Sequence, residues 1–177
     1  PLINGQIPYV VRNGTDKPVF QVIVRAEIRS AAGDLIGAAE TDWVYETKPE
    51  ALNPGDIGIG YVLVNGEYPA DAVYSFTTSY SDTGVKSSVD FEISEASWVT
   101  DHVVGKITNP SESAVEIIIL NLVCLDQGGV PIEFAWNALE GQVPSGGSIV
   151  FQFEPFKFTH SAPCERFLVA GNAFIVD

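Results

Sequence analysis

The two cysteines of the chain, Cys124 and Cys164, are the residues best suited to a covalent role. Because side chains alternate along a strand, the pattern around Cys124 directs its thiol inward. A disulfide between the two would close a loop of about 40 residues and stabilise the fold by about 4 kcal/mol by restricting the unfolded chain. The sequence leaves two alternatives open, one disulfide or two separate buried thiols.

The other polar residues do not assemble into a catalytic or metal-binding pattern. A structural zinc site needs four ligands in close-spaced pairs, and only His160 and Cys164 are spaced like such a pair. His102 lies in an expected strand, and the glycines around Asp56 lead into a strand and not into a phosphate-binding helix. A calcium site built from scattered loop acids such as Asp126 is a weaker alternative. We therefore expect no metal, no cofactor and no enzymatic activity.

Aromatic side chains offer a second kind of chemistry. Trp43 and Trp136 follow corresponding hairpins in the two halves of the chain. Aromatic faces stack on sugar rings, so these residues are candidates for a carbohydrate-binding or adhesion site. The alternative is that both tryptophans pack in the core or between sheets.

The composition and net charge of the chain limit the classes of partner that it could bind. The chain has 177 residues, 46% hydrophobic and 18% charged, with a net charge of −14, and both halves are acidic. This composition indicates a globular chain and argues against nucleic acid, because phosphate binding needs clustered Lys and Arg. No apolar run is long enough for a spanning helix. Because the chain contains no Met, we expect it to be part of a longer protein, with any signal peptide or anchor outside it.

Alternating apolar residues predict a β protein organised around one long strand within residues 18–35. Phe20, Val22, Val24, Ala26 and Ile28 fall on its inner face. Turn-forming residues recur every 8 to 12 positions, a spacing typical of an antiparallel sandwich. Further strands are expected near residues 6–12, 35–41, 57–64, 73–80 and 87–93.

The same order of turns and strands returns about 96 residues later. Asn109-Pro110-Ser111-Glu112 leads into a second long strand over 115–126, as Asn13-Gly14-Thr15-Asp16 leads into the first. The turn at Val143-Pro144-Ser145-Gly146 repeats the one at Leu52-Asn53-Pro54-Gly55. We therefore predict two tandem immunoglobulin-like antiparallel β-sandwiches, residues 1–95 and 96–177.

These turns and strands resemble the bacterial FxLYD domains, a group of immunoglobulin-like sandwiches. The family's Phe-x-Leu-Tyr-Asp motif would fall on Leu122-Val123-Cys124-Leu125-Asp126, where both aromatics are replaced. The resemblance covers most of both halves. It implies a secreted or surface-exposed bacterial protein and carries over no catalytic residues.

The outer face of the second long strand is the most informative surface. It carries the apolar residues Ile117, Ile119, Val123 and Leu125 around Asn121, whereas the first strand presents charged and polar residues there. Such a patch invites association, so something should cover it: the first domain, a second copy, a protein partner or the 153–158 segment. The sequence thus predicts a non-enzymatic extracytoplasmic binding or assembly module, with a protein partner or homo-oligomer contacting the second domain.

Overall fold

The computed structural model describes residues 5–41, 51–84, 88–99, 102–153 and 164–175, and these residues fold into β-strands joined by turns and loops. The first half contains β1 (Gln6–Arg12), β2 (Val19–Arg29), β3 (Leu35–Glu40), β4 (Ala51–Leu52), β5 (Ile57–Leu63) and β6 (Val73–Ser81). The second half contains β7 (Ser88–Val89), β8 (Glu92–Val99), β9 (His102–Thr108), β10 (Val115–Leu125), β11 (Pro131–Val143), β12 (Ser148–Phe153) and β13 (Arg166–Ile175). The predicted all-β class is confirmed.

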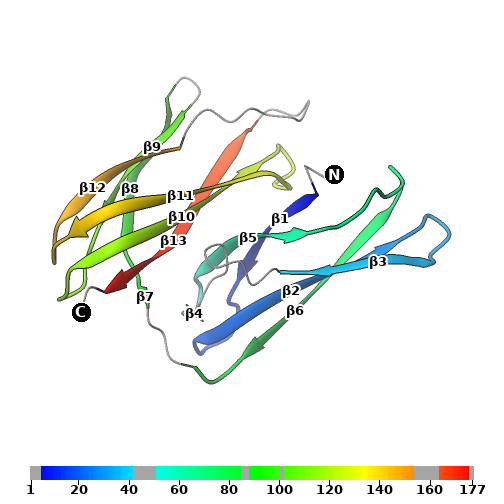
Figure 1. The fold of residues 1–177 in the computed structure, drawn as a ribbon, viewed down its shortest axis with the longest axis horizontal. Coiled ribbons are helices and arrows are strands. Elements are labelled where there is room, and N and C mark those ends of the chain that lie inside the picture. Colours follow the sequence, from blue (N-terminus) through cyan, green and yellow to red (C-terminus); the bar gives the residue numbers. More distant parts are fainter. Residues whose placement is uncertain (1–4, 42–50, 85–87, 100–101, 154–163, 176–177) are drawn as a thin grey trace.

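Each half pairs its strands in two antiparallel sheets. In the first half β1 pairs with β5, while β2 pairs with β3 and β4 along one edge and with β6 along the other. In the second half one sheet has the order β11-β10-β13-β7 and the other β12-β9-β8. Figure 1 shows the two sets side by side, the blue-to-teal strands of the first half on the right and the green-to-red strands of the second on the left.

Apolar side chains fill the space between the two sheets of each half. In the second half, Leu120 and Leu122 of β10 pack with Val103 and Ile107 of β9 and Phe151 of β12, all at most 1% exposed. A smaller cluster in the first half joins Val24, Ala26 and Ile28 of β2 to β1 and β5. The inner face predicted for the first long strand is therefore confirmed at these three residues and at Val22, which is also buried.

The repeat is reproduced in three dimensions at the turn before each long strand. Asn13 donates from Nδ2 to the carbonyls of Lys17 and Leu52, and its Oδ1 accepts from the N–H and hydroxyl of Thr15. The second half repeats this network 96 positions later, since Asn109 donates to Ser113 and Val143 and accepts from Ser111. Both asparagines are buried, at 4% and 1% exposed. A turn that looks unremarkable in sequence is thus a buried corner that fastens two sheets together.

The boundary between the halves lies earlier than predicted. Residue 95 falls inside β8, which pairs with β9 of the second half, and β7 pairs with β13. The expected strand over 87–93 therefore does not close the first half. The chain passes from one set of sheets to the other between Ser81 and Ser88. The error arose because alternation identifies a strand without identifying the strand it pairs with.

Two strands of the second half have no described counterpart in the first. By the 96-residue offset β9 corresponds to β1 and β13 to β6, and by an offset of 91 residues β12 corresponds to β5, which leaves β7 and β8 without a described counterpart. Among the described residues, β1 consequently pairs along one edge only, with β5. Trp98 belongs to β8 and packs on the second-half core, with its ring 6.3 Å from that of Phe167.

A candidate binding site between the two halves

The apolar outer face of β10 is covered by the first half of the same chain. Val123 and Leu125 form a buried cluster with Ile59 of β5, and Val10 of β1 packs against it. At the margin of this contact the ring of Tyr61 lies 5.0 Å from that of Phe134. The face is thus an internal interface between β10 and the sheet formed by β1 and β5.

This arrangement corrects the prediction that the face recognises an external partner. Ile119, Val123 and Leu125 are only 3%, 0% and 6% exposed, so they are not open to a second protein. Of the covers that the sequence left open, the structure has the first half over Val123 and Leu125. Ile117 lies in β10, but its side chain is outside the described part of the structure, as is most of the 153–158 segment.

The cysteines are joined. Cys124 is fully buried on the inner side of β10, as its position in the alternation predicted, and it forms a disulfide with Cys164. The two Cα atoms are 5.4 Å apart, inside the usual range for a disulfide. The disulfide joins β10 to the residues just before β13. β10 and β13 are adjacent strands of one sheet.

The two tryptophans of the carbohydrate hypothesis do not form a described pair. Trp43 lies outside the described residues. Trp136 of β11 pairs with Asn121 across the strands, shares its outward direction and is 52% exposed. A single half-exposed indole is therefore what the structure shows of that candidate surface.

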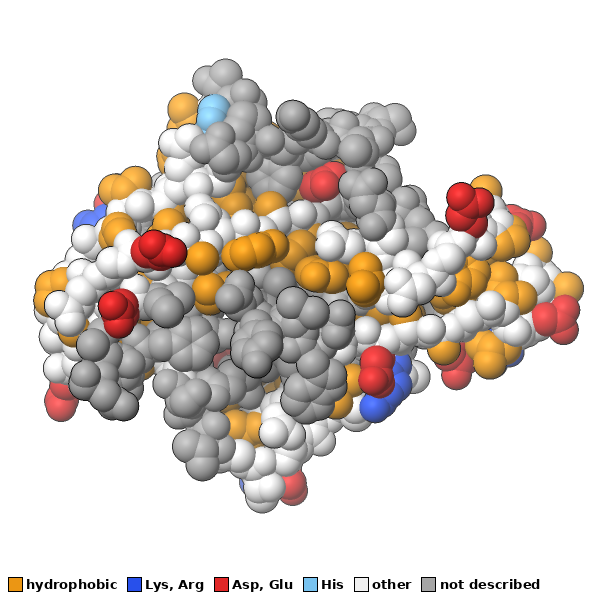
Figure 2. Space-filling model, in the orientation of Figure 1, with side chains coloured by type: hydrophobic (Ala, Val, Ile, Leu, Met, Phe, Trp, Pro, Cys, Tyr) orange, Lys and Arg blue, Asp and Glu red, His pale blue; other side chains and the backbone are white. Residues whose placement is uncertain are grey.

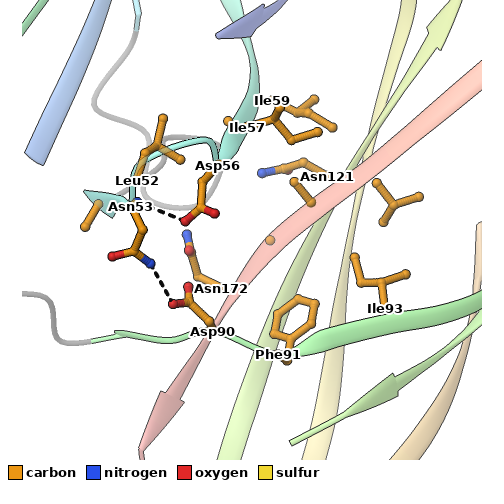
Figure 3. A pocket seen from close by; sticks show the side chains of 15 residues that line it. Leu52, Asn53, Asp56, Ile57, Ile59, Asp90, Phe91, Ile93, Asn121 and Asn172 are labelled. Carbon is orange, nitrogen blue, oxygen red and sulfur yellow. Dashed lines mark hydrogen bonds between the residues drawn. The ribbon is translucent and has the colours of Figure 1, made fainter. Parts of the chain in front are cut away.

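A cavity of about 330 Å³ opens where the two halves meet, beside the covered face. The turn between β4 and β5 forms its wall in the first half, while residues around β7, β8, β10 and β13 form its wall in the second (Figure 3). The lining combines apolar side chains with five polar ones: Asn53, Asp56, Asp90, Asn121 and Asn172. This mixture of apolar walls and a few polar groups is typical of ligand sites.

Asn53 holds the two carboxylates of the cavity in place. Its backbone N–H donates to Oδ2 of Asp56 at 2.9 Å, and its side-chain Nδ2 donates to Oδ2 of Asp90 at 3.2 Å. The second bond crosses from the first half to the second and is drawn in Figure 3. The backbone supports this arrangement, because Asp56 N–H closes a turn onto the carbonyl of Asn53 and Gly55 adopts a φ of 88° that favours glycine.

Asn121 is the unusual group of the cavity. It is 4% exposed in the middle of the apolar face of β10, and its Oδ1 is buried with no hydrogen-bond partner among the described residues. Burying an amide without a compensating hydrogen bond costs about 1–3 kcal/mol by protein mutational data. In Figure 3 the end of the Asn121 side chain points toward Asp56, on the side of the cavity where Asn172 and Asp90 also lie. Asn121 is therefore better suited to hydrogen-bonding a ligand than to packing in the interface.

Sequence analysis missed this site because its residues come from separated segments. The one usable signal was Asn121, a carboxamide that interrupts an otherwise apolar strand face. Asp56 was considered only for phosphate binding, and Asp90 was assigned to a first-half strand. Nothing local in the sequence brings these groups together, because the cavity depends on how the halves pack.

Other features of the described chain add no competing site. Within those residues, no group of three or more His, Cys, Asp or Glu side chains is arranged to hold a metal ion. The described residues also include no helix long and apolar enough to cross a membrane. On the face shown in Figure 2, acidic side chains are spread out and basic ones are few, without a single charged patch.

Comparisons with known proteins add no assignment: no protein-family model matches the chain, and no curated protein matches it. The resemblance to FxLYD domains therefore stays a prediction from the sequence. The cavity between the halves has to be interpreted from its own chemistry.

Proposed function

We propose that this chain is a non-enzymatic, extracytoplasmic binding module built from two immunoglobulin-like sandwiches, and that it binds a small ligand in the cavity between them. The observation that carries the proposal is Asn121 on the cavity wall, whose buried carboxamide oxygen has no hydrogen-bond partner among the described residues. A ligand that donates a hydrogen bond to this oxygen would offset the free-energy cost of burying it without a partner.

The internal repeat supports the two-sandwich description. Both halves place an asparagine corner before the long strand and a glycine turn before the corresponding later strand, at Gly55 and Gly146, both with positive φ. Each half packs one antiparallel sheet on another, as immunoglobulin-like domains do. An FxLYD-type origin remains part of the proposal.

The chemistry of the cavity supports binding over catalysis. Its five polar side chains are carboxylates and carboxamides, which hold ligands by hydrogen bonds and charge. The described lining contains no histidine, cysteine or serine to serve as a nucleophile or its base. Location outside the cytoplasm is supported by the Cys124–Cys164 disulfide, since such bonds persist mainly in oxidising compartments.

A thermal-shift screen tests the proposal. The wild-type chain would be screened against amines, sugars, amino acids and divalent cations, beside an Asn121→Leu variant that fills the same space without a polar group. We expect at least one ligand class to raise the melting temperature of the wild type but not of Asn121→Leu. An Asn137→Ala variant, which changes a half-buried asparagine of β11 outside the cavity, should respond like the wild type. The proposal fails if no class stabilises the wild type, or if Asn121→Leu is stabilised equally.

Carbohydrate binding on the surface is the second candidate, favoured by the half-exposed indole of Trp136. A glycan array probed with the wild type and with Trp136→Ala would test it. Binding that is lost in Trp136→Ala but kept in Asn121→Leu would assign recognition to the surface of β11 and not to the cavity.

A further inference from the structure

We infer that the ligand of the cavity between the halves is a neutral sugar of a single ring, held by polar side chains on one side and by apolar side chains on the other. The inference rests on the proposed function of the same cavity and adds the chemical class of the ligand. The pair of carboxamides in the cavity, the absence of basic residues from its lining and its apolar wall each point to that class.

Two carboxamides lie close together on the wall that the second half contributes. Asn172 of β13 is paired with Ile119, two residues before Asn121 on β10, so the two asparagines are diagonal neighbours on the same face of the sheet. Both line the cavity, and Asn172 is half-buried where Asn121 is almost completely buried. A ligand at this wall therefore meets two carboxamides side by side.

Hydroxyl groups suit these carboxamides better than charged groups do. A carboxamide has an oxygen that accepts and an NH₂ group that donates, and a half-turn about its last side-chain bond exchanges the two in the same space. An ammonium group only donates and a carboxylate only accepts, so each fits one of the two orientations. A hydroxyl group donates and accepts. It can therefore bond to whichever atom faces it, including the Asn121 oxygen, which has no partner among the described residues.

Asp56 adds an acceptor from the first half. Its Oδ2 accepts from the N–H of Asn53 at 2.9 Å, and an ionised carboxylate has about four lone-pair sites, so it can also accept from a ligand. Figure 3 shows the polar ends of Asp56, Asn121 and Asn172 on the same side of the cavity. A ring with hydroxyls on neighbouring carbons can donate to the carboxylate and accept from a carboxamide at the same time.

The charge of the lining opposes acidic ligands. None of the described residues around the cavity is a lysine or an arginine. The net charge of −14 also repels anions from the molecule as a whole. A phosphate or a carboxylate would thus meet no opposite charge, whereas a neutral sugar needs none.

The apolar side of the cavity and its size fit one sugar ring. A sugar ring carries hydroxyls around its rim and C–H groups on its two faces, so one face can pack on an aromatic ring such as that of Phe91. The other large apolar residues of the lining are Ile57, Ile59 and Ile93. The cavity volume of about 330 Å³ is at the small end of the roughly 300–1,000 Å³ of ligand pockets, which favours a single ring over a longer chain.

Isothermal titration with matched probes tests the inference. The sugars are glucose, galactose, mannose and N-acetylglucosamine. The controls are cyclohexanol, with one hydroxyl on a ring of similar size, cyclohexylamine as the cation and glucuronate as the anion. We expect at least one sugar to bind at least about tenfold more tightly than each control, because only the sugars supply several neutral hydroxyls. Raising sodium chloride from about 20 to about 500 mM should leave the affinity for that sugar unchanged, because a neutral ligand is not screened.

Two variants assign the binding to this cavity. Asn172→Ala removes one of the two carboxamides and should weaken sugar binding about threefold to tenfold. Asn137→Ala removes a half-buried carboxamide of β11 outside the cavity and should leave binding unchanged. If Asn172→Ala does not fold, as judged by circular dichroism, the ratio of sugar to control affinities and the salt dependence of the wild type still decide the question.

The outcomes separate the ligand class from the proposed function. If cyclohexylamine or another class of the broader screen binds, the sugars do not, and Asn121→Leu abolishes that binding, the sugar inference is wrong and the binding function of the cavity stands. If no probe binds and the broader screen also finds no ligand, both fail. Sugar binding that is equal in the wild type, Asn172→Ala and Asn121→Leu would place the sugar elsewhere and overturn the inference.

Discussion

Replacing Asn109 by alanine should cost more stability than any comparable change to an exposed asparagine. Asn109 is 1% exposed and donates from Nδ2 to the carbonyls of Ser113 at 2.8 Å and Val143 at 3.1 Å. Its Oδ1 accepts from the N–H and hydroxyl of Ser111 at 3.0 and 2.7 Å. One side chain therefore connects the start of β10 to the end of β11.

The size of the effect follows from which partners keep access to water. Ser111 and Ser113 lie near the surface and can turn to solvent, so each lost bond there costs about 0.5–1.5 kcal/mol. Val143 is 3% exposed, and a buried carbonyl that loses its partner costs about 1–3 kcal/mol. Together these terms predict a loss of about 2–4 kcal/mol in the free energy of unfolding. Asn13→Ala should lose a similar amount, because its network is the same.

Urea denaturation followed by fluorescence measures this loss from the transition midpoint, provided the slope of the transition does not change. Asn137→Ala is the matched control, since Asn137 is only half-buried and donates a hydrogen bond near the surface, to the carbonyl of Gln152 at 3.0 Å. It should lose less than about 1 kcal/mol. Asn109→Asp should retain the contacts to Ser111 and still lose the donors. If Asn109→Ala lost no more stability than Asn137→Ala, the buried hydrogen bonds of Asn109 would not stabilise the fold, and the prediction would be refuted.

The remaining predictions concern the disulfide, the interface between the halves and one partly buried acid. Reduction of the Cys124–Cys164 disulfide, or the Cys164→Ser substitution, should lower the free energy of unfolding by up to about 4 kcal/mol and with it the melting temperature. Calorimetry with and without reductant measures this change. An unchanged melting temperature would show that the disulfide does not stabilise the fold. Val123→Asp, which buries a charge between the halves, should destabilise by at least about 3 kcal/mol in urea, whereas Val150→Asp, at a position 73% exposed, should change little; equal effects would contradict the interface. Burial raises the pKa of Glu133, whose Oε2 has no hydrogen-bond partner among the described residues. The folded state therefore binds the proton of this carboxyl group more tightly than the unfolded state does. The stability that this proton contributes is present at low pH and is lost as pH rises through the pKa of the folded state. Glu133→Gln should therefore be more stable than the wild type at neutral pH but not at low pH, and a constant difference across pH would rule out that titration.

Much of the fold could be predicted from the sequence because local alternation determines it. The long strand predicted over 115–126 is β10 (Val115–Leu125), and the strand over 6–12 is β1 (Gln6–Arg12). Pairing was less accessible. The strand expected over 87–93 is two strands of the second half, since which edge a strand joins depends on contacts far along the chain.

The same distinction applies to function. The outer face of β10 was correctly expected to need a cover, because its apolar residues are adjacent in sequence by the strand period. That the cover is β1 and β5, and that it leaves a cavity next to Asn121, depends on the packing of one half on the other. Sequence indicated the conspicuous residue, and only the fold placed Asp56 and Asp90 beside it.

The two-stranded sheet of β1 and β5 has a consequence for how this protein behaves when crowded. Odd-numbered residues of the β1 segment bond toward β5, as the bonds from Val64 N–H to the carbonyl of Gly5 and from Asn13 N–H to the carbonyl of Asp56 show. Even-numbered residues therefore face the other rim, where Pro8 has no N–H to offer. A β-strand of another molecule that paired with this edge of β1 would lack one backbone hydrogen bond in the middle of the strand. Pro8 therefore opposes aggregation by edge-to-edge strand pairing.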